Sequence, residues 1–146
     1  MAETGEFTDV DRSAVVNLLD ENALKSGIAG RLLRKIDGVV ISPAGSKTPG
    51  AATITVTGLV TTTPIVFFEP PSDFDRRHIR DRIDASGVDS SGVTEVRDSF
   101  GVTVFEFGND PTGTELVAFA ISGLAALGVK PADGRWEYRA TEPEGD

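Results

Sequence analysis

The sequence contains no cysteine, which excludes disulfides, cysteine-ligated zinc, iron–sulfur clusters and thiol catalysis within this chain. It contains a single histidine, His78, which excludes zinc motifs that take two histidines from one chain. The longest apolar run, residues 116–127, is too short to cross a bilayer, because a spanning helix needs about 20 residues. We therefore expect no metal, no cofactor and no membrane span.

Basic residues are also scarce: 14 lysines and arginines stand against 23 aspartates and glutamates, which gives a net charge of −9. Such a chain repels phosphate-rich surfaces, so we expect neither duplex nucleic acid nor a membrane as a partner. Only four of the 14 basic residues are lysine, a ratio that adaptation to high salt and a GC-rich coding bias explain equally well. The acidic first residues, 1–6, lack the apolar segment of a signal peptide, so we expect a cytoplasmic protein.

The remaining composition is typical of one globular domain. The chain has 146 residues, of which 39% are hydrophobic and 25% are charged. A chain of this length buries roughly 70% of its unfolded surface, which is enough for a core without disulfides. We expect a single domain over residues 1–141 and an acidic, flexible tail over residues 142–146.

Hydrophobic spacing and capping signals predict about three helices. Thr8 and Asp11 have the spacing of an N-cap and its acidic partner, which favours a helix start there. Asp110 followed by Pro111 is typical of the start of another helix. The expected helices cover residues 8–25, 72–86 and 110–128.

Apolar alternation and turn residues predict strands over residues 51–60, 65–68, 93–97, 102–107 and 135–141. Ile65–Phe68 is apolar on both faces, so we expect it at the centre of a sheet. Residues 28–42 fit a helix followed by a strand or, slightly better, a hairpin of strands 31–36 and 39–41 that turns at Asp37-Gly38. The mixture of hairpins and helices predicts an α+β fold, a two-layer sandwich with helices on a mainly antiparallel sheet.

Known catalytic motifs are not matched. Gly45-Ser-Lys-Thr48 lacks the earlier glycines of a phosphate-binding loop, and the serines at 90 and 91 lack the spacing of a nucleophile elbow. His78 lies between arginines on an expected helix, where a surface position is the simpler interpretation than a general base. No catalytic residue is predicted.

Four of the ten arginines lie within seven residues of this otherwise acidic chain: Arg76, Arg77, Arg80 and Arg82. They could form a docking surface for phosphate, nucleic acid or an acidic protein partner. A purely structural explanation also exists, because Asp73–Arg77, Arg77–Asp81 and Arg80–Asp84 have the spacing of ion pairs along one helix. The structural explanation is favoured, and the partner surface stays as the alternative.

Residues 116–127 carry no charge, and a helix that is apolar all round must be covered all round. We expect Leu116, Ala120, Leu124 and Leu127 to face the sheet. The remaining face would pack on the N-terminal helix or form an interface with a second subunit. Its residues are Phe119, Ser122, Gly123 and Ala126.

These observations support three hypotheses for the function. The first is a non-catalytic interaction or assembly protein that self-associates. The second is a regulatory domain that binds a small anionic ligand at helix N-termini or on the arginine cluster. The third is an enzyme that uses carboxylates with a divalent metal. We rank them in this order.

Overall fold

The computed structural model of the chain describes residues 4–24, 36–45, 50–57, 63–70, 77–99, 102–108, 110–131 and 133–141. The described strands are β1 (Thr4–Thr8), β2 (Gly38–Pro43), β3 (Ala51–Thr57), β4 (Thr63–Glu69), β5 (Val93–Ser99), β6 (Val102–Phe107) and β7 (Arg135–Thr141). They form a seven-stranded sheet in the order β1-β7-β2-β3-β4-β6-β5, and each neighbouring pair is antiparallel.

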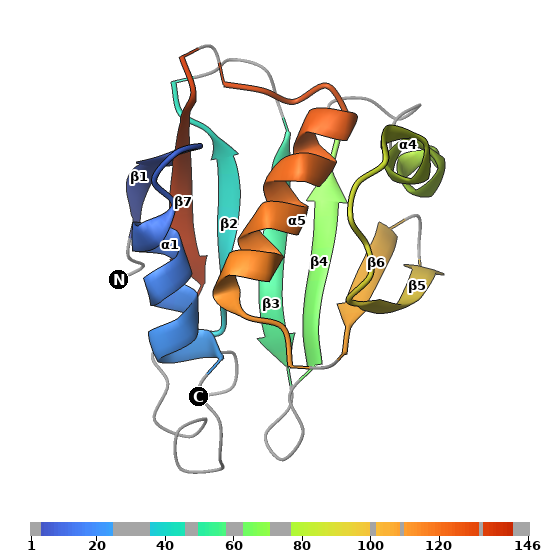
Figure 1. Cartoon of the computed structure of the whole chain (residues 1–146), viewed down its shortest axis with the longest axis horizontal. Helices are drawn as coiled ribbons and strands as arrows, with labels where there is room; N and C mark the ends of the chain where they lie inside the picture. Colours follow the sequence, from blue (N-terminus) through green and yellow to red (C-terminus); the bar gives the residue numbers. More distant parts are fainter. Residues whose placement is uncertain are drawn as a thin grey trace.

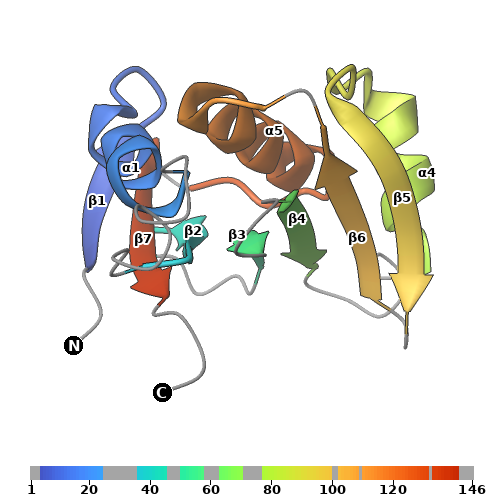
Figure 2. The ribbon, with the colours of Figure 1, turned by 90° about the horizontal axis from the view of Figure 1, so that it is seen from below.

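The described helices are α1 (Ser13–Leu18), which continues as the π-helical turn η1 (Leu19–Ala23), α4 (Ile79–Ser86) and α5 (Gly113–Ala126). Figures 1 and 2 show α1 and α5 across one face of the sheet, with α4 near the C-terminal end of α5. The predicted α+β fold is confirmed. None of the described helices is long and apolar enough to cross a membrane.

The last strand holds the first one in the sheet, because β7 lies between β1 and β2 (Figure 1). Its side chains alternate as predicted: Trp136 and Tyr138 are buried, whereas Glu137 and Arg139 are exposed. The indole Nε1 of Trp136 donates to Asp9 Oδ1 at 2.7 Å, so its one polar group is paired. The two ends of the chain are therefore joined through main-chain and side-chain bonds.

The helix expected over residues 8–25 begins later than predicted. Thr8 ends β1, whose Phe7 is buried opposite Trp136, and the helix begins at Ser13. The Thr8–Asp11 contact that resembled a helix cap exists, with Asp11 N donating to Thr8 Oγ1 at 3.1 Å. It closes a turn, because Thr8 N also donates to Asp11 O at 3.2 Å. Burial of Phe7 in the sheet overrides the local helix signal.

The strand expected over residues 39–41 is found, and both alternatives for residues 28–42 predicted it. The expected hairpin with residues 31–36 is wrong, because β2 pairs with β3 along one edge and with β7 along the other. Its hairpin partner is β3. Residues 25–35, where the alternatives differ, lie outside the described residues, as does the expected tail at 142–146.

The helix expected over residues 72–86 is interrupted at His78, whose backbone is non-helical (φ −121°, ψ 21°). Arg77 therefore precedes α4, and the residues before it, 71–76, lie outside the described part. Ile79 and Ile83 are buried as expected, and Gly87 ends the helix in the left-handed conformation. Burial of these two isoleucines places one face of α4 in the hydrophobic core.

The start of α5 also differs from the prediction. Asp110 has a left-handed backbone (φ 48°), which an N-cap residue does not adopt, and the N-cap is Thr112. Thr112 Oγ1 accepts from Glu115 N at 3.2 Å, and Glu115 Oε1 accepts from Thr112 N at 3.1 Å. This reciprocal pair satisfies two backbone donors at the helix start.

Charged groups from other elements bind both ends of α5. At its N-terminus, Asp20 Oδ1 of η1 accepts from Gly113 N at 2.8 Å. At its C-terminus, an Nη of Arg82 in α4 donates to Ala126 O at 3.1 Å. Each charge has the sign that the helix dipole favours at that end. The helix, whose one charged residue is Glu115, is therefore stabilised by a carboxylate and a guanidinium that it does not carry itself.

The apolar face of α5 is wider than the sequence predicted. Leu116, Ala120, Leu124 and Leu127 are buried as expected. Phe119, expected to face away from the sheet, is also buried, with its ring centroid 5.9, 5.2 and 5.0 Å from those of three sheet phenylalanines, Phe68, Phe105 and Phe107. The large aromatic rings of β4 and β6 therefore contact residues of α5 that the sequence predicted to lie away from the sheet.

Gly123 is a point of close approach between α5 and the sheet. A Cβ at this position would lie 2.3 Å from Cζ of Phe68, a ring held between Phe105 and Phe119. We predict that Gly123→Ala lowers the free energy of unfolding by about 1–2 kcal/mol, because overpacking outweighs the better helix propensity of alanine. Ser122→Ala, on the exposed side of the same turn, is the control and should be neutral or slightly stabilising. Identical urea denaturation curves for wild type and Gly123→Ala would contradict this close packing.

Candidate interaction surfaces

The arginine cluster divides into a structural residue and two exposed residues. Arg82 is half-buried and bonds the end of α5, so it supports the fold. Arg77 and Arg80 are exposed, and within the described residues neither takes part in an ion pair. Arg76 lies outside the described part of the chain.

Two of the three helical ion pairs predicted for these arginines do not form, and the third, Asp73–Arg77, involves a residue outside the described part of the chain. Asp81 lies 4.0 Å from Nδ1 of His78, and no contact joins it to Arg77. Asp84 likewise makes no ion pair with Arg80. The positive charges of Arg77 and Arg80 therefore face solvent.

The predicted interface on α5 is partly inside the chain's own core. Phe119 and Gly123 are buried against the phenylalanines of the sheet, so they are not accessible to a second subunit. Ser122 is exposed and Ala126 is half-buried. These two residues line a groove that the sequence did not predict.

This groove, called the α5 groove below, lies between α5 and residues 86–92, the segment that runs beside the helix from α4 to β5 (Figure 1). It consists of two adjoining clefts of about 220 and 410 Å³. Val88, Asp89 and Ser122 line both clefts and mark their junction.

The α5 groove is lined by acidic side chains and by aromatic rings. Phe107 and Phe119 line the smaller cleft together with the carboxylates of Asp89 and Glu115. Asp89 Oδ1 accepts from Ser91 N at 3.0 Å, and the hydrogen bonds from the backbone and side chain of Ser91 lower the pKa of Asp89. Among the described residues, neither cleft is lined by a lysine, arginine or histidine, although Arg82 bonds the carbonyl of Ala126 beside the larger cleft. The charged side chains of the described lining are therefore both acidic.

The sheet face opposite α5 carries a second candidate surface, called the open face below. Cross-strand register places Val40, Thr53, Phe67 and Val104 in one row across four adjacent strands, β2, β3, β4 and β6. Ile65 lies in the next row, opposite Thr55. The four apolar side chains are half-buried, and the threonine at the middle of the row is 9% exposed. None of the described helices lies over this row (Figure 2).

The sequence contained a signal for this surface. Ile65–Phe68 was predicted to be central because it is apolar on both faces, and β4 is central, between β3 and β6. Val66 and Phe68 are buried under α5, whereas Ile65 and Phe67 point to the open face. An antiparallel strand with one solvated face normally carries polar residues there. The apolar residues on both sides of β4 therefore indicate that burial of the open face would be favourable.

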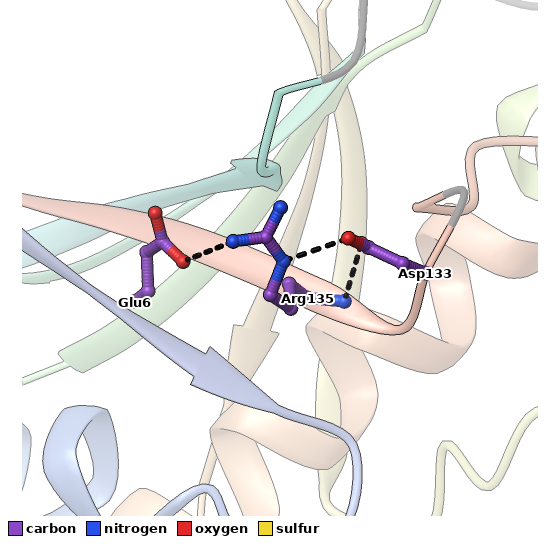
Figure 3. Close-up of polar contacts among 3 residues, drawn as sticks. All are labelled: Glu6, Asp133 and Arg135. Carbon is purple, nitrogen blue, oxygen red and sulfur yellow. Dashed lines mark hydrogen bonds and ion pairs between the residues drawn. The ribbon is translucent and has the colours of Figure 1, made fainter.

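Charged residues on β1 and β7 border the open face, beside a shallow hollow of about 350 Å³. Glu6 and Glu137 lie directly opposite each other, an arrangement that destabilises neighbouring strands. Arg135 offsets this repulsion, because an Nη lies 3.4 Å from Glu6 Oε1 and Nε lies 2.8 Å from Asp133 Oδ2. Figure 3 shows Arg135 between these two carboxylates. Within the described residues, Arg139 makes no ion pair.

The role of Arg82 as the C-terminal partner of α5 can be tested by substitution. We predict that Arg82→Gln lowers the free energy of unfolding by about 1 kcal/mol, because a charged hydrogen bond to Ala126 O is lost. Arg80→Gln removes the same charge from an exposed position of α4 and should change stability by less than about 0.5 kcal/mol. Equal effects of the two variants in urea denaturation would show that Arg82 does not stabilise α5.

The Arg135 contacts predict a measurable pKa change. The Arg135 side-chain hydrogen bond lowers the pKa of Asp133 from 3.8, so the stabilising contribution of this carboxylate is lost as the pH falls through the lowered value. In Arg135→Gln, the pKa of Asp133 should rise toward 3.8, as followed by NMR of the carboxyl carbon. The control is Asp11, whose pKa is lowered by its hydrogen bonds to Ser13 and should not change. An unchanged Asp133 titration would contradict the contact.

The chemistry of known sites does not identify the molecule. Within the described ranges, no group of three or more histidine, aspartate or glutamate side chains could hold a metal ion. His78 is 45% exposed and faces Asp81. Comparison with protein-family models, with curated proteins and with solved structures finds no match for this chain.

Proposed function

We propose that the protein is a non-catalytic assembly module that self-associates through the open face of its sheet. One observation carries this proposal: Val40, Ile65, Phe67 and Val104 form an apolar cluster, bordered by the Arg97–Glu106 ion pair, on a face that none of the described helices covers. Contiguous apolar surface of this kind is typical of protein contact sites. A cytoplasmic location is part of the same proposal.

Two features favour a second copy as the occupant of this face. A twofold contact buries the same patch on both subunits. The charges around that patch must therefore be complementary to a second copy of themselves. The border on β7 carries both signs, with Glu137 and Arg139 exposed on successive outward positions. Sheets with apolar faces also pack on each other with their strands nearly aligned, and the apolar residues here lie on four adjacent strands.

Sedimentation or light scattering of the purified protein tests the proposal. We expect wild type to have twice the chain mass and Phe67→Glu to be a folded monomer, because a buried, unpaired carboxylate would cost several kcal/mol at such an interface. Val102→Glu, on the same face but 41% exposed, gives a second test with less risk to folding. Val10→Glu is the matched control, since Val10 is 96% exposed in the turn after β1.

The outcomes are distinct. A monomeric wild type would refute self-association. A dimer that survives both Phe67→Glu and Val102→Glu would place the contact elsewhere on the molecule. Loss of the dimer in Val10→Glu to the same extent would mean that added negative charge, not the open face, controls association.

A second candidate function is a regulatory domain that binds a small anion. The observation that favours it is the exposure of Arg77 and Arg80 without an ion pair in the described chain. Guanidinium groups bind phosphate and carboxylate through paired hydrogen bonds. A thermal-shift screen with inorganic phosphate and nucleotides tests it, and stabilisation that disappears in an Arg77→Gln, Arg80→Gln double variant would support it.

A further inference from the structure

We propose that the α5 groove binds a short basic segment of another protein, with a lysine or arginine side chain in the smaller cleft beside Asp89 and Glu115. This site does not depend on the proposed self-association, because the groove borders α5 and the open face is on the other side of the sheet. The proposal rests on the shape, the charge and the apolar lining of the groove.

The shape of the groove fits an extended segment. Its wall on α5 consists of residues three or four positions apart, which lie on one stripe of the helix and run from Thr114 to Ala126. These residues span about 18 Å of helix axis, the length of roughly five residues of extended chain. The clefts meet at Ser122, so one segment can occupy both.

Charge selects the sign of the ligand. Within the described part of the chain, the ionisable groups that line the two clefts are the carboxylates of Asp89 and Glu115. Both residues are exposed, and the chain as a whole carries a net charge of −9, which attracts a basic segment over a distance. An anionic ligand would meet repulsion from both carboxylates.

The apolar lining favours a peptide over a free polyamine. Phe107 and Phe119 form the base of the smaller cleft with the few atoms that they expose, 6% and 3% of each residue, which is too little for a subunit interface. The aliphatic stem of a single lysine or arginine could pack against these atoms. Val88, Ala125 and Ala126 line the larger cleft and suit the apolar side chain of a neighbouring peptide residue. A polyamine has no side chain for that position.

Small residues keep the smaller cleft open. Ala118 is half-buried in its wall, and a Cβ at Gly92 would lie 3.3 Å from the Phe107 ring. A bulky residue at the junction should therefore block the groove without disturbing the core. Ser122 is the position for this test, because its side chain is exposed.

Calorimetry with the full chain tests the proposal. The probe is a capped peptide of about six residues with one lysine flanked by leucine and alanine, a length that spans the groove. We expect binding that weakens with salt, and no binding of the same peptide with glutamate in place of lysine. Chemical-shift changes in NMR should concentrate at Ser91, Gly92 and Ala118.

Three variants locate the binding site. Asp89→Asn should weaken peptide binding by roughly threefold to fivefold, as loss of one exposed charge pair does. Ser122→Trp should remove binding, with an unchanged melting temperature as evidence of folding. Asp11→Asn is the matched control, because Asp11 is an exposed aspartate bonded to a serine two residues later, as Asp89 is. It should bind the peptide like wild type.

Three results would overturn the proposal. The first is no binding of the lysine peptide by wild type at millimolar concentration. The second is equal weakening by Asp11→Asn and Asp89→Asn, which would mean non-specific attraction to an acidic chain. The third is binding of spermidine as tightly as the peptide, which would mean that the groove recognises charge alone. None of these results bears on the mass of the protein, so the proposed self-association is judged separately.

Discussion

The structure depends on how one helix, uncharged after Glu115, is covered and held at its ends. Residues 116–127 of α5 and its continuation carry no charge, and more than half of them are buried. Glu115 is the one charged residue near an end of this helix, and no basic residue lies in its last turn to interact with the helix dipole. Asp20 and Arg82 supply charges at the two ends from elements far away in the sequence. Docking of η1 and α4 is thus coupled to the same helix.

This arrangement explains the unequal faces of the sheet. α5 lies over β3 and β4, where Phe68, Phe105 and Phe119 interlock, so these strands are covered on one face by a single helix. Their opposite side keeps Ile65 and Phe67 half-buried. α5 therefore buries the apolar side chains on only one side of β4, and apolar surface stays exposed on the other side. The proposal of self-association follows from this exposed apolar surface.

Local sequence patterns predicted most strands, because alternation reports directly on which side of a strand is buried. They failed where a distant contact decides the outcome. The Thr8–Asp11 signal was real, but pairing of Phe7 with a strand more than a hundred residues later made its segment a strand end. The α5 groove could not be predicted from the sequence either. It forms only because residues 86–92 lie beside α5, and no local pattern predicts that contact. Arg82 had no sequence signal that separated it from Arg77 and Arg80.

The two proposed surfaces would act together in a specific way. The open face and the α5 groove lie on opposite sides of the sheet, so a pair of chains joined through their open faces would carry both grooves on its outside. Two weak sites on one rigid particle bind a partner with two basic segments far more tightly than one site does, if the linker spans them. Weak binding at an exposed acidic groove therefore becomes selective for partners that are themselves multivalent. Assembly and recognition would be linked through the number of sites, without any change in the shape of either surface.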